Sequence, residues 1–182
     1  MESGHEKKEP LAVLIREMRI EDVEHVYAIE TTAYPSPWPI ECFIGELTSN
    51  NFSRYFVAES EGQIIGYAGI WVIGDEAHVT NVAVDPWFRC RKVAEQLLLY
   101  LIEYSLACGV RSMFLEVRRF NIAAQRLYTR YRFVPTRVRE KYYQDNLEDA
   151  IELRVEDTAE RRFMENYQRR RAKLAAALAP PL

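Results

Sequence analysis

The 182-residue sequence contains only three cysteines, scattered without a C-x-x-C pair or a histidine at ligand spacing. A disulfide framework and a structural zinc site are therefore not expected, and neither is any other metal site. Glycine is also scarce, with seven residues, and the chain shows no fixed-period repeat and no long linker. These absences favour one ordinary domain over a repeat protein or a string of small modules.

The chain also lacks a long apolar segment. Its longest purely apolar run, 97–102, is too short to cross a bilayer, and the charged first ten residues exclude a secretory signal. The formal net charge is −3 and the isoelectric point about 5.7, so the basic excess of a generic nucleic-acid-binding protein is missing. The composition is that of a globular protein, which we expect in the cytoplasm and not at a membrane.

Hydrophobic spacing predicts a mixed α/β (α+β) domain over residues 11–156, between a flexible start (1–10) and a basic helical tail (157–182). Seven strands are expected, at 11–18, 55–60, 64–72, 78–84, 113–118, 136–142 and 150–155. Four helices are expected, at 20–33, 40–49, 92–107 and after Asn121, which caps the last of them. This order predicts a mixed sheet flanked by helices.

The junction between the strand at 78–84 and the helix at 92–107 is the first candidate site. Its loop is rich in arginine, and N–H groups at a helix start are unsatisfied and carry positive potential. A pyrophosphate is a natural ligand for such a turn. Many α/β turns look alike, however, so a plain strand-to-helix connection is the alternative. Within the helix, Glu95 and Gln96 are expected to face water.

The second candidate is Glu116, a carboxylate in the middle of the short apolar strand at 113–118. Burying a carboxylate is costly unless it is paired, so its presence needs a reason. Tyr128 follows on the next helix. The simple alternatives are a salt bridge from Glu116 to Arg118 or Arg139, and a core position for Tyr128 whose hydroxyl reaches the surface.

Together these segments resemble the GNAT acetyltransferase superfamily, and more narrowly its RimI-type branch, the ribosomal-protein-alanine N-acetyltransferases. The resemblance covers about residues 12–155, nearly the whole expected domain. It rests on Pro37-Trp38, on NVAVDP at 81–86, on LEVR at 115–118 with Asn121 and Leu127-Tyr128, and on YYQDNLEDA at 142–150. The resemblance implies a GNAT fold with a mostly antiparallel sheet of about seven strands and four flanking helices, followed by the helical tail.

The resemblance also implies acetyl-CoA as cosubstrate. The backbone of Val82, Ala83 and Val84 is then expected to run beside the pantetheine arm like an extra strand. Asn121 is expected near the sulfur of the cofactor. The amides expected to cradle the pyrophosphate are those of Cys90, Arg91, Lys92, Val93, Ala94 and Glu95; the Cys90 thiol itself is interpreted as a bystander.

The catalytic roles follow from the same resemblance. Glu116 matches the general base of the family and Tyr128 its general acid, while a strand amide at 82–84 polarises the thioester carbonyl. An α-amino group has a pKa of about 7.7–8.0, so a carboxylate can deprotonate it for direct attack in a ternary complex. The resemblance implies the N-terminal alanine of a small-subunit ribosomal protein as substrate. Its groove is expected between two pairs of residues, Pro37 with Trp38 and Tyr142 with Tyr143.

These roles require two neighbouring strands to splay apart around the thioester. Two positions depart from the family pattern, because Lys92 and Arg132 stand where glycine is usual. If the backbone there needs a positive φ, each side chain costs about 1 kcal/mol or more. Two other functions therefore stay open: a catalytically weakened CoA-binding module, and an acetyltransferase for a small amine or a lysine side chain.

The tail begins with a capping-box-like pair, Asp157 and Glu160, and continues as a basic helix. The simpler expectation is a solvated helix that docks through Phe163 and Tyr167. The alternative is a contact with ribosomal RNA or a partner protein.

Overall fold

The computed structural model describes residues 9–179, so the first eight residues of the expected flexible start lie outside it. One seven-stranded sheet has the order β1-β2-β3-β4-β5-β7-β6. Its strands are β1 (Leu14–Glu17), β2 (Ser53–Ser60), β3 (Gln63–Ile73), β4 (Glu76–Val84), β5 (Ser112–Arg118), β6 (Val134–Arg139) and β7 (Ala150–Val155). β4 and β5 are parallel and every other neighbouring pair is antiparallel, which confirms the mixed, mostly antiparallel sheet.

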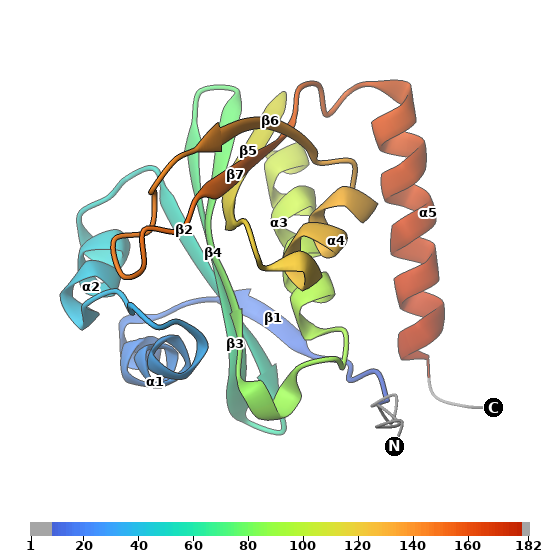
Figure 1. Ribbon diagram of the computed structural model, residues 1–182. Coiled ribbons are helices and arrows are strands. Elements are labelled where there is room, and N and C mark those ends of the chain that lie inside the picture. The colour runs from blue at the N-terminus through green and yellow to red at the C-terminus, as the bar shows by residue number, and fades with distance from the viewer. Residues whose placement is uncertain (1–8, 180–182) are drawn as a thin grey trace, which may run out of the picture.

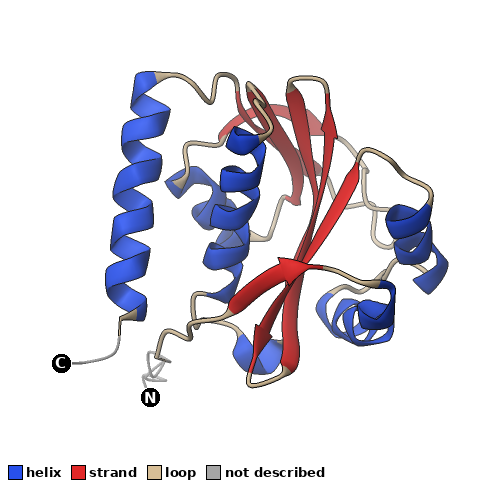
Figure 2. Ribbon diagram, turned by 180° about the vertical axis from the view of Figure 1, so that it is seen from behind, coloured by secondary structure: helices blue, strands red, loops and turns tan. Residues whose placement is uncertain are grey.

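Helices cover both faces of this sheet (Figure 1). The α-helices are α1 (Val23–Ala33), α2 (Ile40–Thr48), α3 (Val93–Ala107), α4 (Ile122–Arg130) and α5 (Arg161–Leu178), and two single 3₁₀ turns are η1 (Ile20–Asp22) and η2 (Pro86–Phe88). α1 and α2 pack on one face around a buried cluster that contains Phe43 and Tyr67. α3, α4 and α5 pack on the other face around Leu97 and Phe163, and the view from behind shows the same division (Figure 2).

β4 and β5 are paired over only part of their length. Pairing ends at Val79 and Leu115, although β4 continues to Val84 and β5 to Arg118. Beyond that point β4 pairs only with β3, and β5 pairs only with β7. The two strands therefore stop pairing beyond this point, as expected for the splay of neighbouring strands, and we call the unpaired region between them the opening.

A β-bulge in β4 lies where the strands part. Gly69 of β3 is opposite Asn81, whereas the next residue, Ile70, is opposite Val79. Thr80 therefore has no opposite residue on β3. Since a bulge bends its strand and increases the local twist, it accounts for the departure of β4 from β5.

Gly69 lets the Tyr55 ring lie directly over this bulge. A Cβ at position 69 would meet the Tyr55 ring at 2.4 Å and the Thr80 hydroxyl at 2.6 Å. Because position 69 has no side chain, the Tyr55 ring fits here, and its hydroxyl donates to Asn81 Oδ1 at 2.9 Å. Tyr55 thus links β2 to the bulged residues of β4.

β1 is shorter than expected because the Gln96 side chain binds the backbone that precedes it. The Gln96 amide accepts from Val13 N at 3.2 Å and donates to Leu11 O at 2.7 Å. Gln96 and its neighbour Glu95 are each 8% exposed, so the expectation that they face water is wrong. Gln96 is polar and yet buried because its side-chain amide hydrogen bonds the backbone of the segment that precedes β1.

β6 is also shorter than expected, since it ends at Arg139 and not at Tyr142. Lys141 adopts a φ of 50°, and its N–H donates to Asp149 Oδ1 at 3.0 Å. This contact closes residues 140–149 into a loop of their own. Tyr142 and Tyr143 therefore lie on a loop and not at a strand end.

The tail docks through Phe163 and Tyr167 as expected. Phe163 is buried, and the Tyr167 hydroxyl donates to Glu103 Oε1 of α3 at 3.0 Å. The expected capping pair does not form, because Glu160 is the N-cap of α5 and no side chain caps it. Over residues 9–179, no helix is long and apolar enough to span a membrane.

We predict that Gly69→Ala lowers the free energy of unfolding by about 2 kcal/mol, because the added methyl group overpacks Tyr55 at the bulge. Gly45→Ala is the control: a Cβ there meets nothing within 4 Å, and alanine is favoured inside a helix by about 1 kcal/mol. Urea denaturation of both variants measures the difference. Equal stability of the two variants would contradict the packing assigned to Gly69.

Candidate active site

The opening between β4 and β5 exposes one edge of β4. Val82, Ala83 and Val84, which are expected to run beside the pantetheine arm, all lie beyond the last β4–β5 pair. An extended ligand can add to such an edge as a further strand. The Val82 carbonyl oxygen accepts a hydrogen bond from the Tyr34 hydroxyl at 2.9 Å, so one side chain already reaches this backbone.

The N-terminus of α3 follows β4 after η2 and a short loop. The first helical hydrogen bond runs from Gln96 N to Lys92 O at 3.0 Å, and no side chain caps the helix. The N–H groups of Val93, Ala94 and Glu95 therefore have no acceptor within the helix. Such a terminus, with its positive dipole end, suits a pyrophosphate.

The loop before α3 and the turn after α4 each contain a left-handed residue where the family pattern has glycine. Lys92 has a φ of 70° and Arg132, after α4, a φ of 66°. Cys90 is also left-handed, with a φ of 64°. Lys92 and Arg132 thus both adopt a backbone conformation that glycine adopts most easily. The Lys92 ammonium lies 2.8 Å from Glu95 Oε2, which gives its charge a partner in the first turn of α3.

Glu116 is nearly buried, and both of its oxygens have partners. Oε2 lies 2.7 Å from His78 Nε2, and Oε1 lies 3.0 Å from the Arg139 guanidinium. Arg139 also binds Glu152 at 2.8 Å, and Glu152 is directly opposite Glu116 on β7. The arginine therefore separates two carboxylates that would otherwise repel each other. The salt bridge to Arg139 exists, whereas Arg118 binds other carboxylates.

His78 is a neighbour of Glu116 that the sequence analysis missed. Its ring stacks on Phe114 with centroids 4.3 Å apart, and Trp71 packs edge-on against it at 5.6 Å. These two rings fix the imidazole beside Glu116. The contact depends on the β4–β5 register, which the sequence does not reveal.

Tyr128 lies in the core below the opening, with its ring 6.1 Å from that of Phe133. Burial raises the pKa of Tyr128 above its ordinary value, and the nearby Tyr143 hydroxyl raises it further. Burial also raises the pKa of Tyr34, with contributions from Tyr128 and Tyr143. The hydroxyls of the three tyrosines are therefore close enough to influence one another, and all three are protonated at neutral pH.

Arg118 holds the loop 140–149 over the end of β5. Its guanidinium binds Asp145 at 3.0 Å and Glu148 at 3.2 Å, and it stacks 3.9 Å above the Tyr143 ring. These contacts explain why the loop is rich in acidic residues. They also fix Tyr143 beside the opening.

Both tyrosines of this loop lie within electrostatic reach of Glu116. Burial raises the pKa of Tyr143 to about 12, and it also raises the pKa of Tyr142; the Glu116 charge adds to both shifts. The two rings meet edge-on at 5.2 Å. Tyr143 is thus a common neighbour of the expected base, Glu116, and the expected acid, Tyr128.

The loop with Pro37 and Trp38 is fixed by Glu30, a second residue that the sequence analysis did not single out. Glu30 is 1% exposed and accepts from Trp38 N at 2.9 Å and from the Tyr67 hydroxyl. Burial raises the pKa of Glu30, and these two hydrogen bonds partly oppose the shift. The Trp38 ring packs on Phe43 at 6.0 Å.

Two other expected site residues lie on the surface. Asn121 caps α4, since its Oδ1 accepts from Ala124 N at 3.1 Å. Arg91 lies in the phosphate loop, and its carbonyl oxygen accepts from Leu11 N at 3.0 Å, which ties this loop to the start of the domain.

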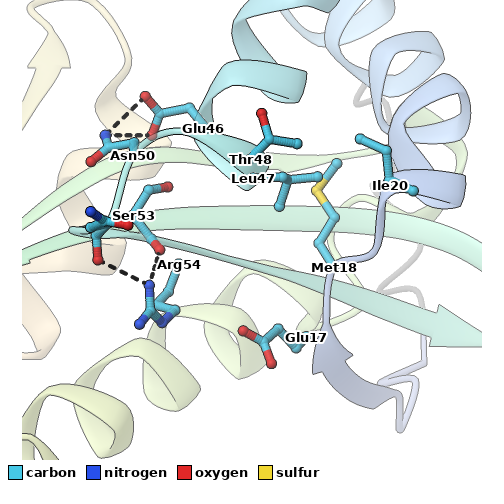
Figure 3. Close-up of a pocket in the computed structure, with 10 residues that line it drawn as sticks. Glu17, Met18, Ile20, Glu46, Leu47, Thr48, Asn50, Ser53 and Arg54 are labelled. Carbon is cyan, nitrogen blue, oxygen red and sulfur yellow. Dashed lines mark hydrogen bonds between the residues drawn. The ribbon is translucent and has the colours of Figure 1, made fainter.

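A separate surface pocket of about 280 Å³ lies at the edge of β2 (Figure 3). Its lining residues are Glu17, Met18, Ile20, Glu46, Leu47, Thr48, Asn50, Asn51, Ser53 and Arg54. None of the expected site residues is among them. Because the Trp71 indole N–H donates to Glu46 at 2.5 Å, the pocket adjoins the residues that hold His78 but does not include the opening.

The split sheet, the uncapped helix terminus and the acidic and phenolic groups near them form the candidate active site. The sequence model of the Acetyltransferase (GNAT) family matches residues 23–133. This match covers more than half of the chain, and the protein belongs to the GNAT family. It is therefore an acetyltransferase, and members of this family use acetyl-CoA.

Individual relatives agree with this assignment. A Bacillus subtilis (strain 168) protein, provisionally named ribosomal protein bS18-alanine N-acetyltransferase, is 40% identical over 137 residues, which are 75% of this chain and 91% of the relative. The Escherichia coli (strain K12) enzyme of that name is 35% identical over 141 residues, covering 75% and 93%. The crystal structure of the ribosomal-protein-S18-alanine N-acetyltransferase from Escherichia coli superimposes with a TM-score of 0.74 at 31% identity, covering 79% and 93%. The expected family and fold are confirmed.

We predict that Glu30→Gln changes how stability depends on pH. Since burial raises the pKa of Glu30, the folded protein keeps this proton to higher pH than the unfolded chain does. Its contribution to stability is complete at low pH and is lost as pH rises past the ordinary glutamate value and through the folded pKa. As the pH rises, the free energy of unfolding of the wild type should therefore fall relative to that of Glu30→Gln.

Urea denaturation at intervals from pH 4 to pH 8 measures this difference. The control is Glu24→Gln, which removes an exposed carboxylate from the same helix. A constant difference between wild type and Glu30→Gln across this range would contradict the assigned shift.

Proposed function

We propose that the protein transfers the acetyl group of acetyl-CoA to the N-terminal α-amino group of a protein in the cytoplasm. The proposed substrate is the N-terminal alanine of a small-subunit ribosomal protein. The names of the relatives from Bacillus subtilis and Escherichia coli support this substrate. The observation that carries the proposal is the opening between β4 and β5, together with Tyr143, which is an electrostatic neighbour of both Glu116 and Tyr128.

In this proposal acetyl-CoA supplies the activated acetyl group as a thioester. The backbone of Val82–Val84 binds the pantetheine arm, and the amides of residues 90–95 hold the pyrophosphate. Asn121 contacts the cosubstrate near its sulfur. The left-handed backbone at Lys92 supports this assignment, because the loop keeps the bend that glycine usually provides.

The reaction is a direct transfer. The amine nitrogen attacks the thioester carbonyl, so a C–N bond forms and the C–S bond breaks. Glu116 takes the amine proton, directly or through a water, and His78 lies 2.7 Å away as the next proton carrier. Tyr128, whose hydroxyl is protonated at neutral pH, gives its proton to the departing thiolate.

An amide of β4 at 82–84 polarises the carbonyl in this scheme. Cys90 takes no part, since the amine attacks without a covalent enzyme intermediate. In this proposal the two segments that line the peptide groove are aromatic, with Trp38 on one loop and Tyr142 and Tyr143 on the other. A groove of this kind favours a peptide over a small amine.

A panel of peptides tests the substrate. We predict that an alanine-headed peptide incubated with acetyl-CoA gains one acetyl group on its α-amine, located by fragmentation in a mass spectrometer. A peptide with a blocked N-terminus and an internal lysine should stay unmodified. Modification of the lysine side chain alone would contradict the proposal, and the absence of acetyl-CoA binding by calorimetry would indicate a non-catalytic module.

We predict that Glu116→Gln and Tyr128→Phe each lower kcat/KM by at least about a hundredfold, the usual contribution of a general base or acid. The matched controls are Glu156→Gln, an exposed carboxylate just after β7, and Tyr131→Phe, whose hydroxyl binds Glu95 at 3.3 Å. Both controls should keep activity within a few-fold. Steady-state kinetics with the alanine-headed peptide measures the effect, and full activity of both site variants would refute the roles.

A further inference from the structure

Positive charge is concentrated in two segments of this otherwise acidic chain. Residues 117–139 contain seven arginines and no acidic residue, and residues 161–182 contain six basic residues and one glutamate. The chain as a whole has a formal net charge of −3. The remaining segments therefore carry a marked acidic excess, so the charge is segregated along the sequence.

The fold brings these two segments together. The side-chain amide of Asn166 on α5, in the orientation that satisfies both neighbours, donates to Arg130 O at 2.9 Å. It also accepts from the Arg169 guanidinium at 3.0 Å. The end of α4 and the middle of α5 are therefore in direct contact, and Figure 1 shows the two helices side by side.

Exposed cations line this contact on its solvent side. We define the basic face as six exposed residues of α4, the turn after it and α5: Arg126, Arg130, Arg132, Arg162, Arg169 and Lys173. Within residues 9–179, none of the six forms an ion pair with a carboxylate. By contrast, Arg161 and Arg171 on other sides of α5 are paired with Glu165 and Glu103.

The spacing along α5 produces a stripe. Arg162, Arg169 and Lys173 are seven and four residues apart, so they lie along one flank of the helix. This stripe is about 16 Å long at the rise of an α-helix. Arg126 and Arg130 are one turn apart and exposed on α4, and the contact of the Arg130 backbone with Asn166 places this end of α4 beside the stripe.

We propose that the basic face binds the phosphate backbone of RNA. Five of its six cations are arginines, whose planar guanidinium groups bind phosphate oxygens in pairs. Cations without carboxylate partners, spread over two adjacent helices, match a regular row of phosphates. The apolar side of α5, with Phe163 and Leu174, is buried on the domain, which leaves α5 no apolar face to insert into a membrane.

The basic face is distinct from the candidate active site. None of its residues is assigned to acetyl-CoA, to the peptide or to proton transfer. Its α5 part also lies outside the segment matched by the family model, residues 23–133. The inference therefore goes beyond acetyl transfer and does not depend on it.

Fluorescence anisotropy with a labelled 20-base-pair RNA duplex and the full chain tests the proposal. We expect Arg162→Gln/Lys173→Gln to weaken binding at 50 mM salt. A plot of the logarithm of the RNA association constant against the logarithm of the salt concentration has a negative slope. In the double variant this slope should become less steep by about two, one for each cation that no longer neutralises a phosphate. The control, Arg19→Gln/Arg161→Gln, removes the same charge from exposed positions outside the basic face and should bind like the wild type.

Equal weakening by the two double variants would overturn the proposal, because only total charge would then matter. Absence of RNA binding by the wild type at 50 mM salt would overturn it as well. Binding to phosphatidylserine vesicles without binding to RNA would show that the face is a membrane surface instead. Acetylation of the short alanine-headed peptide should be the same in all these variants, so failure of that reaction in the wild type would affect only the proposed function.

Discussion

The candidate chemistry of this protein depends on one break in an otherwise continuous sheet. Where the two central strands stop pairing, backbone N–H and C=O groups lose their partners in the sheet and need other hydrogen-bond partners. Tyr34 takes the Val82 carbonyl oxygen, and Arg89 Nε donates to Val84 O at 3.2 Å. These side chains allow the free protein to keep the opening, while an extended ligand could use the rest of the edge. The bulge at Thr80 thus creates a binding edge and the space beside it.

Charge compensation across the sheet holds the acidic group at this opening. A polar row runs from Trp71 and His78 through Glu116 to Arg139 and Glu152, crossing β3, β4, β5, β6 and β7. Each charged member of the row has an opposite or hydrogen-bonding neighbour, which is how carboxylates survive burial. Glu116 is thereby oriented on both oxygens. The position of this carboxylate consequently depends on residues of three other strands.

Local patterns predicted most of the elements and the backbone parts of the site. The strand, the arginine-rich loop and the helix start lie where their spacing indicated, as do Glu116 and Tyr128. The predictions that were wrong concern contacts between segments that are far apart in the sequence. Gln96 was expected in water because its helical position is polar, yet it binds the chain before β1. The place of His78 beside Glu116 follows from strand register, and no local pattern encodes register, whereas the salt bridge of Glu116 to Arg139 was one of the two expected from sequence.

Lys92 and Arg132 show that a left-handed backbone conformation can be kept when a residue other than glycine occupies the position. Both adopt left-handed angles, with φ of 70° and 66°, at the two positions where the sequence resemblance leads us to expect glycine. The surrounding fold therefore imposes the bend on whatever side chain is present. A motif search that demands glycine at these two places would pass over this chain. Homologues with similar replacements are better recognised from the dihedral angles than from the letters of the motif.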